Sequence, residues 1–560
     1  MQPDSDATPA AVRLRSRAGR EANGAEVRVR VRAILLVALM LAGILTAGAV
    51  VRTGVPRAAN MPRGGQLPVV NLASSTSIEW ECPGPLPAGS SSKQSSVVID
   101  NPGRALARVQ VFVDAVAAVP RRAERALPSW STELALAPGT QRVVALRRTG
   151  PRQDDAVSVL EIAGSVAVFE STVTVPRAAA SSGGKRRAPR SLPSPTQQES
   201  PCATGGTTSS YIAAGSTSGR SDILVALFDP TATQAVVGIR ASTASGVVVP
   251  PALQGLIIRP YSLQVFDLAR LVVQQALVAI SDETSMGRVV LGAYETVASD
   301  PTAATALHGQ ALVIGVGSPR SSWVMTPGPV ARSGTVSVDV YDPGSRAADV
   351  SISSRSASSQ GSGRPVVEIS AIVPAGDVRE ITLPSPTVPP ARTPKPTPRQ
   401  ILRGPIVLKA AGGVGVVVAR SGVQQVAAHA QTVALLAATC EPASEWLLPV
   451  AASSIASTGG SLPERGGIVV SDPGDVPATI EVVRLATDGP SRSHLAVMSL
   501  APGATVTLAL SLPGPGTAFA GLELISSSPV VAEQDLSSVA PPHRVVMFAP
   551  APLEGIPLLP

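Results

Sequence analysis

The segment that decides the fold reads VSVDVYDPG and spans Val336–Gly344. Valine alternates with a polar residue from Val336 to Val340, and this period of two is typical of a β-strand with one face in a core and the other in water. Asp342 and Pro343 then predict a turn, because proline lacks an amide donor and the preceding carboxylate can accept a hydrogen bond from its own backbone. The segment therefore predicts a strand that ends in a tight turn.

This strand and turn recur in four copies along the chain. An Asn or Asp precedes proline at the end of one strand in every copy, at Asn101, Asp229, Asp342 and Asp472. An aromatic residue opens every copy, at Trp80, Tyr211, Trp323 and Trp446. A second hairpin signal and a Val-rich strand follow each time, with the hairpin prolines at Pro138, Pro260, Pro374 and Pro502. The order of these signals predicts a fourfold internal repeat.

The composition favours strands over helices. The 560 residues include 49 Gly and 53 Pro but only 2% aromatic residues, and short Val-rich runs lie between the Gly and Pro positions. Six or seven strands per copy predict an all-β fold of tandem immunoglobulin-like β-sandwich repeats, with a β-propeller-like arrangement as the alternative. Two stretches, Asp267–Gln275 and Val423–Leu436, have apolar residues at near-helical spacing and predict short helices.

These signals divide the chain into repeats and connecting segments. We expect a basic cytoplasmic tail at 1–32, a transmembrane helix or signal anchor at 33–51, a linker at 52–74, the first β repeat at 75–177, a basic Pro/Ser linker at 178–201, the second repeat at 202–299, the third repeat at 318–421 with a disordered insertion at 384–400, the fourth repeat at 440–545 and a tail at 546–560.

One apolar run, Ala33–Val51, is free of charge and bounded by Arg32 and Arg52. A helix of this length matches a hydrocarbon core of about 30 Å. Arginines crowd the N-terminal side of the run, and the positive-inside bias then places the N-terminus in the cytoplasm and the bulk of the chain outside the cell. The alternative is a signal peptide that is cleaved near Ala47–Ala49, followed by secretion.

The three cysteines, Cys82, Cys202 and Cys440, lie far apart and lack the spacing of metal ligands. An oxidising compartment allows one structural disulfide. Cys82 and Cys202 each lie beside a proline at the start of a repeat, which favours that pair, and three unpaired thiols are the alternative.

The ordered signals resemble a repeat of exported actinobacterial proteins that is classed as a domain of unknown function. The matching residues are Trp323, Asp342–Gly344 and Pro374–Gly376 in the third copy, and Trp446, Asp472–Gly474, Pro502–Gly503 and Pro529–Glu533 in the fourth. The resemblance implies a single-pass, membrane-anchored protein of the cell envelope without an assigned activity.

The charge distribution argues against nucleic acid as a partner. The formal net charge is +7, but the basic excess lies in residues 1–52, 179–200 and 384–403, and the rest of the chain is slightly acidic. The chain also offers few aromatic side chains on which bases could stack. The expected partners are the lipid bilayer, through one helix, and an envelope protein or glycan.

No combination of residues predicts a catalytic, cofactor-binding or metal site. The histidines are isolated from one another in sequence, at His308, His429, His494 and His543. Gly215–Gly219 has threonine where a serine hydrolase carries its nucleophile. Gly412–Gly415 lacks the Lys-Ser/Thr ending of a phosphate loop and predicts a tight bend.

The acids of the repeat have a structural and a functional interpretation. Asp229, Asp342 and Asp472, with Asp339 nearby, suit turn capping better than calcium binding, because no loop supplies six oxygen ligands. Three further acids close their copies, at Glu170, Glu295 and Glu533, and the sequence does not assign them as a catalytic pair.

We expect a non-enzymatic scaffold or interaction protein of the cell envelope. The alternative is a glycan-binding, lectin-like protein or a glycan-active protein of cell-wall assembly. Two carboxyls about 5–10 Å apart in a cleft would favour an enzyme. An exposed row of Trp and Tyr would favour a lectin, whereas aromatics packed in the core favour the scaffold.

Overall fold

β-Strands dominate the part of the chain that the computed structural model describes. The described residues are 70–71, 78–83, 92–115, 130–146, 155–175, 196–213, 215–219, 221–298, 306–328, 334–354, 367–383, 404–427, 430–437, 442–449, 465–486, 493–510, 519–537, 545–548 and 551–554. Besides strands, they contain three short 3₁₀ helices, η1 (Pro251–Leu253), η2 (Leu268–Arg270) and η3 (Ala411–Gly413). The all-β prediction is confirmed for these residues.

The two predicted helices are absent from the described residues. Asp267–Gln275 contains only the single turn η2. Val423–Leu436 falls on strands β25 (Val417–Ala427) and β26 (Ala430–Ala437). Both strands have a partner on each side, and pairing within a sheet overrides a weak helical spacing of apolar residues.

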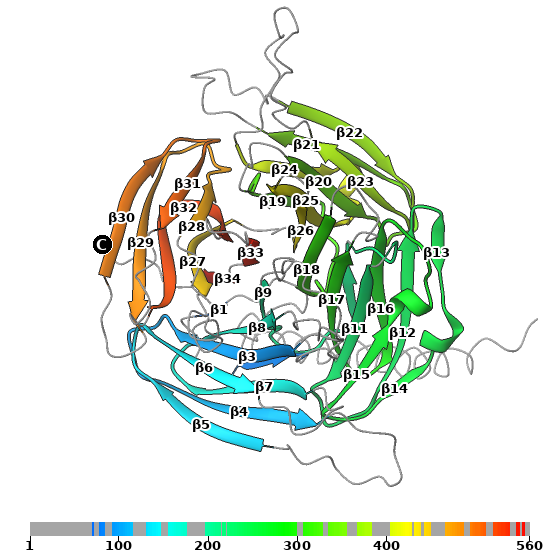
Figure 1. Cartoon of the computed structure of the whole chain (residues 1–560), viewed down its shortest axis with the longest axis horizontal. Coiled ribbons are helices and arrows are strands. Elements are labelled where there is room, and N and C mark those ends of the chain that lie inside the picture. The colour runs from blue at the N-terminus through cyan, green and yellow to red at the C-terminus, as the bar shows by residue number, and fades with distance from the viewer. Residues whose placement is uncertain are drawn as a thin grey trace, which may run out of the picture. The chain divides into compact units, whose positions relative to one another are not determined.

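Each copy contains two antiparallel sheets that enclose one core (Figure 1). Copy 1 consists of β2 (Glu79–Cys82), β3 (Ser92–Asn101), β4 (Ala107–Ala115), β5 (Trp130–Leu136), β6 (Thr140–Leu146), β7 (Asp155–Ala163), β8 (Ala167–Val175) and β9 (Thr196–Pro201). One sheet has the order β2-β7-β4-β5 and is called the flanking sheet. The other has the order β6-β3-β8-β9 and is called the joining sheet.

Copies 2, 3 and 4 repeat this order. Copy 2 consists of β10 (Ser209–Ile212), β11 (Asp222–Asp229), β12 (Ala235–Thr243), β13 (Gly246–Val248), β14 (Leu256–Ile258), β15 (Ser262–Asp267), β16 (Val278–Met286), β17 (Val290–Ala298) and β18 (Ala306–Ile314). Copy 3 consists of β19 (Ser322–Met325), β20 (Gly334–Tyr341), β21 (Ala348–Ser354), β22 (Val367–Val373), β23 (Val378–Leu383), β24 (Ile406–Ala410), β25 and β26. Copy 4 consists of β27 (Ala443–Pro449), β28 (Arg465–Ser471), β29 (Ala478–Ala486), β30 (Ser493–Leu500), β31 (Thr505–Leu510), β32 (Phe519–Ser537) and β33 (Val545–Phe548). The long β32 runs through both sheets of copy 4.

The strand order differs from that of an immunoglobulin domain. β3 pairs with β6 and β8, and β4 pairs with β5 and β7. In a constant-type immunoglobulin domain the seventh strand instead lies beside the sixth. The copies therefore share the size and the two-layer arrangement of immunoglobulin domains but not their pairing order.

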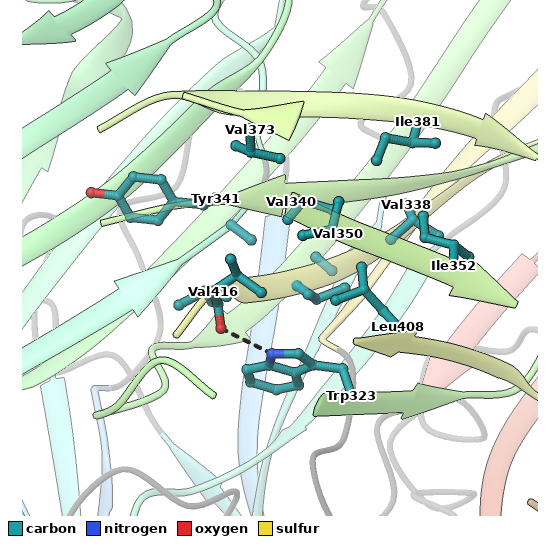
Figure 2. Packing of buried hydrophobic residues seen from close by; sticks show 14 of the residues in the cluster. Trp323, Val338, Val340, Tyr341, Val350, Ile352, Val373, Ile381, Leu408 and Val416 are labelled. Carbon is teal, nitrogen blue, oxygen red and sulfur yellow. Dashed lines mark hydrogen bonds between the residues drawn. The ribbon is translucent and has the colours of Figure 1, made fainter. Parts of the chain in front are cut away.

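The core of copy 3 shows how the two sheets are tied together (Figure 2). Val340 of β20, in the joining sheet, shares one buried cluster with Val350 and Leu408 of the flanking sheet. Trp323 of β19 is 1% exposed, and its indole Nε1 donates to the carbonyl of Val416 at 2.9 Å. Because Val416 directly precedes β25, this hydrogen bond links the first strand of the flanking sheet to the joining sheet.

The joining sheets are buried on both faces, which the alternating pattern does not predict. On the face of β20 that was expected to meet water, Ser337 and Asp339 are only 4% and 2% exposed. The corresponding runs Val97–Ile99 and Ile468–Val470 are completely buried. Continuous apolar runs are typical of strands that are covered on both sides. The water-facing prediction is wrong because the second face of each joining sheet contacts a neighbouring copy.

The Asx-Pro turns have the same hydrogen bond in every copy. The amide of Gly344 donates to Oδ1 of Asp342 at 2.8 Å, and Gly474 donates to Asp472 at the same distance. The matching bonds in copies 1 and 2 join Gly103 to Asn101 and Thr231 to Asp229, each at 2.9 Å. Turn capping therefore accounts for the repeated Asx residues.

The second hairpin is bonded to the Asx residue in copies 1, 3 and 4, and in copy 1 the amide of Gly139 donates to the carbonyl of Asn101 at 2.8 Å. Gly376 donates to the carbonyl of Asp342 at 2.8 Å, and Gly503 makes the equivalent bond to Asp472 at 2.9 Å. Gly376 has φ +79°, a conformation that glycine adopts without steric cost. Tyr261 takes this place in copy 2 with φ +53°.

The last strands of the copies join one copy to another (Figure 1). β18 pairs in parallel with β26 and connects copies 2 and 3, while β33 pairs in parallel with β9 and connects copies 4 and 1. The expected boundaries missed these strands: β9 lies within the predicted linker 178–201, because its sequence TQQESP lacks Val-rich alternation. The predicted linker 52–74 and tail 546–560 also contain the short strands β1 (Val70–Asn71) and β34 (Ala551–Glu554), which pair with each other.

The predicted membrane segment Ala33–Val51, the insertion 384–400 and Cys440 lie outside the described residues. Within the ranges given above, no helix is long and apolar enough to cross a bilayer.

The Asx turns predict a stabilising substitution. In copy 1, Asn101 accepts from Gly103 through Oδ1 and also donates from Nδ2 to the carbonyl of Leu136 at 2.9 Å. Asp342 has no such donor, its Oδ2 is buried without a partner among the described residues, and burial raises its pKa. We expect Asp342→Asn to raise the free energy of unfolding by about 1 kcal/mol and Asp342→Ala to lower it by about 1 kcal/mol. Urea denaturation at pH 7 measures both.

The matched control for this prediction is Asp349→Asn, at an exposed position on β21. It is expected to change stability by less than about 0.5 kcal/mol. An Asp342→Asn protein less stable than the wild type would contradict this account of the turn.

Candidate functional site

The repeat aromatics lie inside the copies. Trp80, Trp323 and Trp446 are at most 1% exposed. Nε1 of Trp446 donates to the carbonyl of Val530 at 2.9 Å, which is the copy 4 equivalent of the Trp323 bond. Tyr211 is half-buried, and its ring lies 6.4 Å from that of Tyr341, centroid to centroid. These side chains are packing and hydrogen-bonding elements of the fold.

A disulfide joins Cys82 to Cys202, with the two Cα atoms 4.8 Å apart and both residues fully buried. It links β2 to the residue after β9, at a point where Glu81 and Ala203 also exchange backbone hydrogen bonds. Structural disulfides persist in oxidising compartments, so this bond indicates that the described part of the chain lies outside the cytoplasm.

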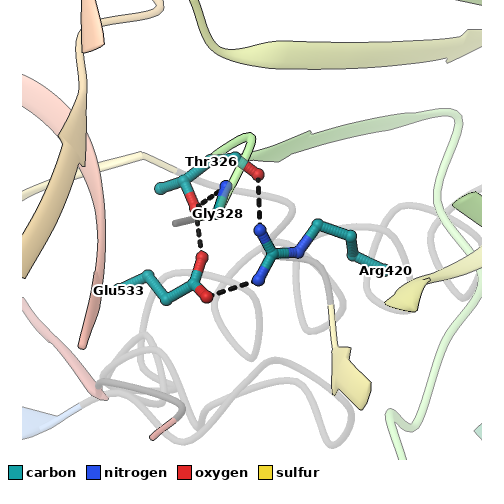
Figure 3. A network of polar contacts seen from close by, with 4 residues as sticks. All are labelled: Thr326, Gly328, Arg420 and Glu533. Carbon is teal, nitrogen blue, oxygen red and sulfur yellow. Dashed lines mark hydrogen bonds and ion pairs between the residues drawn. The ribbon is translucent and has the colours of Figure 1, made fainter. Parts of the chain in front are cut away.

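The polar site with the most complete geometry lies between copies 3 and 4 (Figure 3). Arg420 of β25 forms an ion pair with Glu533 of β32, and the side chains are 5% and 1% exposed. The second carboxylate oxygen of Glu533 accepts from the hydroxyl of Thr326. Arg420 also donates to the carbonyl of Thr326 at 3.4 Å, and the amide of Gly328 donates to the Thr326 hydroxyl at 3.2 Å.

The arrangement of this site is that of an internal contact. Two ionised groups removed from water are strongly destabilising unless they are paired and their remaining hydrogen-bonding positions are filled. Here the guanidinium, the carboxylate and the hydroxyl bond to one another, so none of the three is oriented toward an external reactant. The site therefore connects copies and shows no acid–base constellation.

Gly328 is the residue that gives the guanidinium its space. Its φ is +75°, and a Cβ atom at this position would overlap the Arg420 side chain. Sequence reasoning missed Thr326 and Gly328, although the Thr-Pro-Gly segment that begins three residues after Trp323 was a visible signal.

Arg420 and Glu533 occupy different positions in the strand register of their copies. Arg420 lies opposite Val338, four residues before the Asx position, whereas Glu533 lies opposite Val469, three residues before it. The residues equivalent to Arg420 are Glu170, opposite Val97, Ala293, opposite Val225, and Gln534, opposite Ile468. Arg420 and Glu533 are thus partners across a junction and not two versions of one position.

Glu295 lies at a different junction from Glu533. It is 7% exposed on β17, and its Oε1 accepts from the amide of Ser216 at 2.8 Å. Burial raises its pKa to about 8, and the negative charge of Asp339 in copy 3 contributes to this increase. Glu170 is buried in copy 1. The structure therefore places these acids within or between the copies.

The remaining sequence candidates have structural roles where they are described. The exposed imidazole of His494 contacts the carboxylate of Glu481. Ser216, in the stretch Gly215–Gly219, bonds to the carbonyl of Gln275 through its hydroxyl at 3.2 Å. Gly412–Gly415 begins in η3, where Gly412 has φ +64°, so this stretch is a tight bend. No group of three or more His, Cys, Asp or Glu side chains within the described ranges has the geometry of a metal site.

Comparison with known proteins identifies one segment. Residues 198–387 match a family of unknown function, DUF5719. The DUF5719 segment begins at β9, contains copy 2 and ends after β23 of copy 3. No curated protein matches the chain. The comparison thus supports the resemblance to a family without known activity and assigns no reaction to it.

Removal of the disulfide is predicted to destabilise the protein. The bond closes a loop with a sequence separation of 120 residues, for which the chain-entropy argument gives about 5 kcal/mol. We expect Cys82→Ala with Cys202→Ala to lower the free energy of unfolding by this amount in urea denaturation. Reduced wild-type protein is the control and should behave as the double variant does. Equal stability of the oxidised and reduced forms would contradict the prediction.

The buried ion pair gives a second prediction. Glu533→Leu leaves the Arg420 charge buried without a counter-ion, and we expect a loss of about 3 kcal/mol in the free energy of unfolding. Arg420→Met alone should cost a similar amount, because the carboxylate then lacks its partner.

Combining Arg420→Met with Glu533→Leu removes both charges and should restore most of that loss. Denaturation of the four proteins of this cycle measures the coupling. Single variants that each cost less than about 1 kcal/mol would mean that water reaches the pair.

Proposed function

We propose that the chain is a membrane-anchored, extracytoplasmic scaffold or interaction protein of the bacterial cell envelope, without enzymatic activity. In this proposal the apolar run Ala33–Val51 is the anchor, residues 1–32 are cytoplasmic and the four copies are β-sandwich modules outside the cell. The resemblance to exported actinobacterial repeat proteins supports the same cellular placement.

The burial of the repeat tryptophans is the observation that carries the proposal. A lectin that stacks sugars on these residues needs them exposed, but Trp80, Trp323 and Trp446 are at most 1% exposed. Two of the three indoles also donate to a carbonyl of the opposite sheet. The residues that recur in every copy therefore support the fold of the copy, which favours the scaffold over the lectin.

The acids support the same interpretation. The Asx side chains cap turns, and Glu533 is paired with Arg420. A glycosidase needs two carboxyls that reach one substrate from opposite sides. Asp229, Asp342, Asp472 and Glu295 instead accept hydrogen bonds from the backbone, and Glu533 bonds to a neighbouring copy.

The flanking sheets provide the surface for a partner. They carry exposed apolar side chains in all four copies, with Trp130 46%, Ile257 56%, Ile372 62% and Val497 66% exposed. Scattered apolar residues of this kind occur on many surfaces. Their exposure on the outer strands β14, β22 and β30 makes Ile257, Ile372 and Val497 the positions to substitute in a binding test.

The test is capture of partners by the unit Gly64–Pro560 with its disulfide intact. Immobilised protein is incubated separately with detergent-solubilised envelope proteins and with purified cell-wall glycans, and a retained protein is then purified and rebound alone. We expect one envelope protein to bind, and Ile257→Ser, Ile372→Ser and Val497→Ser together to weaken binding by at least tenfold, because these changes remove exposed apolar area without touching the core.

The control is the Asp349→Asn protein, which should bind as the wild type does. Retention of glycan with no protein partner would favour the lectin. Shortening of the glycan chains during incubation would favour an enzyme.

A further inference from the structure

Two buried carboxyls from different copies interact across the junction between copies 2 and 3. We propose that this junction closes with the side chains of Glu295 and Asp339 protonated, and that it loosens when both lose their protons to an alkaline medium. The device is thus a proton-dependent contact between two modules of one chain. It is independent of which partner the protein binds.

The junction is a continuous interface. Ala213, Ala279 and Val316 of copy 2 belong to the same buried cluster as the core of copy 3. Tyr341 of β20 donates from its hydroxyl to Ser281 of β16 at 3.1 Å, and its ring lies beside Tyr211. β18 of copy 2 and β26 of copy 3 pair with each other, so the joining sheets of the two copies form one continuous sheet. A change in charge here therefore acts on a packed contact and not on a solvent-filled gap.

The two acids have little to stabilise a negative charge. Glu295 is 7% exposed and accepts one backbone hydrogen bond, from Ser216. Asp339 is 2% exposed, and its Oδ1 has no hydrogen-bond partner among the described residues. An ionised carboxyl in such a place is strongly disfavoured relative to its neutral form.

The neighbouring groups increase this effect. Burial raises the pKa of Asp339 to about 7. The hydrogen bond from the hydroxyl of Ser421 lowers this pKa, and the negative charge of Glu380 raises it. Once Asp339 is ionised, its charge helps to keep the proton on Glu295. Asp282, also at this junction, has a pKa that burial raises to about 7, although it bonds to Ser210 and Thr284. None of the groups that shift these three pKa values is a cation.

A proton fits this site better than a metal ion does. Calcium requires six to eight oxygen ligands. Near Asp339 the described side chains add the hydroxyl of Ser421 and the carboxyl of Glu380, which is fewer ligands than calcium needs, and the amide of Ser216 is a donor that a cation would repel. Within the described ranges these acids do not form a cluster that could hold a metal ion. Two buried carboxyls with so few hydrogen-bond donors instead hold their protons, and the charge of Asp339 adds to this effect at Glu295.

The sign of the pH dependence follows from the direction of these shifts. An unfolded carboxyl has a pKa near 4, so the folded state binds protons that the unfolded state has already lost. This contribution to stability is complete below about pH 4 and is lost as the pH rises toward 8. The unfolding equilibrium constant should increase with pH in that window, by up to about tenfold per pH unit for each such proton.

The experiment compares the full chain with Glu295→Gln, Asp339→Asn and the double variant from pH 5 to 8.5. Each amide has the shape of the neutral acid and cannot ionise. We expect the increase in the unfolding constant with pH to be shallower in each variant. Exchange of the Ser216 amide proton with solvent reports on the junction itself. At pH 8.5 we expect it to be at least severalfold faster in the wild type than in Glu295→Gln, and at pH 6 to be similar in both.

Glu283→Gln is the matched control, because Glu283 is an exposed carboxyl of β16 paired with Arg240. It should leave the pH profile unchanged. A second measurement is the infrared band of protonated carboxyl groups at pH 7, which does not require a variant that is stable at high pH. This band should be weaker in Glu295→Gln than in the wild type. Parallel pH profiles for the wild type and the double variant would overturn the proposal. The proposal would also be overturned if added calcium, at constant pH, slowed the exchange of the Ser216 amide in the wild type but not in the variants, because the site would then bind a cation.

Discussion

Burial of the joining sheets on both faces is the constraint on which the rest of the structure depends. One face closes the core of its own copy, and the other contacts neighbouring copies. Val97–Ile99 and Ile468–Val470 are completely buried for this reason. Removing apolar area from water is the main favourable term in folding, and each joining sheet contributes it twice. The copies therefore share buried contacts with their neighbours and are not independent domains joined by linkers.

The same constraint explains why the polar residues of these sheets are so few and so specifically placed. A charge on the second face has no water to solvate it, so it must be paired, bonded or neutral. Arg420 and Glu533 are paired, and the pKa values of Glu295 and Asp339 are raised by burial. Apart from the buried Asp residues of the turns, the described interior of each copy is built mainly from Val, Ile, Leu and Trp, while Arg420, Glu533, Glu295 and Asp339 lie at the junctions between copies.

Local signals predicted the parts of the fold that depend on local chemistry. Alternation and Asx-Pro turns located the second strand of every copy, because strand period and turn capping involve residues close in sequence. The sequence could not reveal β9 or β18, because their partners β33 and β26 lie far away along the chain and their own patterns are weak. The site was missed for the same reason: Thr326, Arg420 and Glu533 meet only after two copies have folded and docked.

The contrast between repeated and unique residues indicates how the order of the copies is specified. The Asx residues recur because every copy needs the same turn, and Trp323 and Trp446 make the same hydrogen bond in copies 3 and 4. At the position of Arg420, however, the equivalent residues are Glu170, Ala293 and Gln534. A copy moved to another place would bring a buried charge against the wrong neighbour, and an unpaired buried charge is far more destabilising than a lost apolar contact. The residues that differ between copies therefore determine which copies lie together, and the residues that recur determine how each one folds.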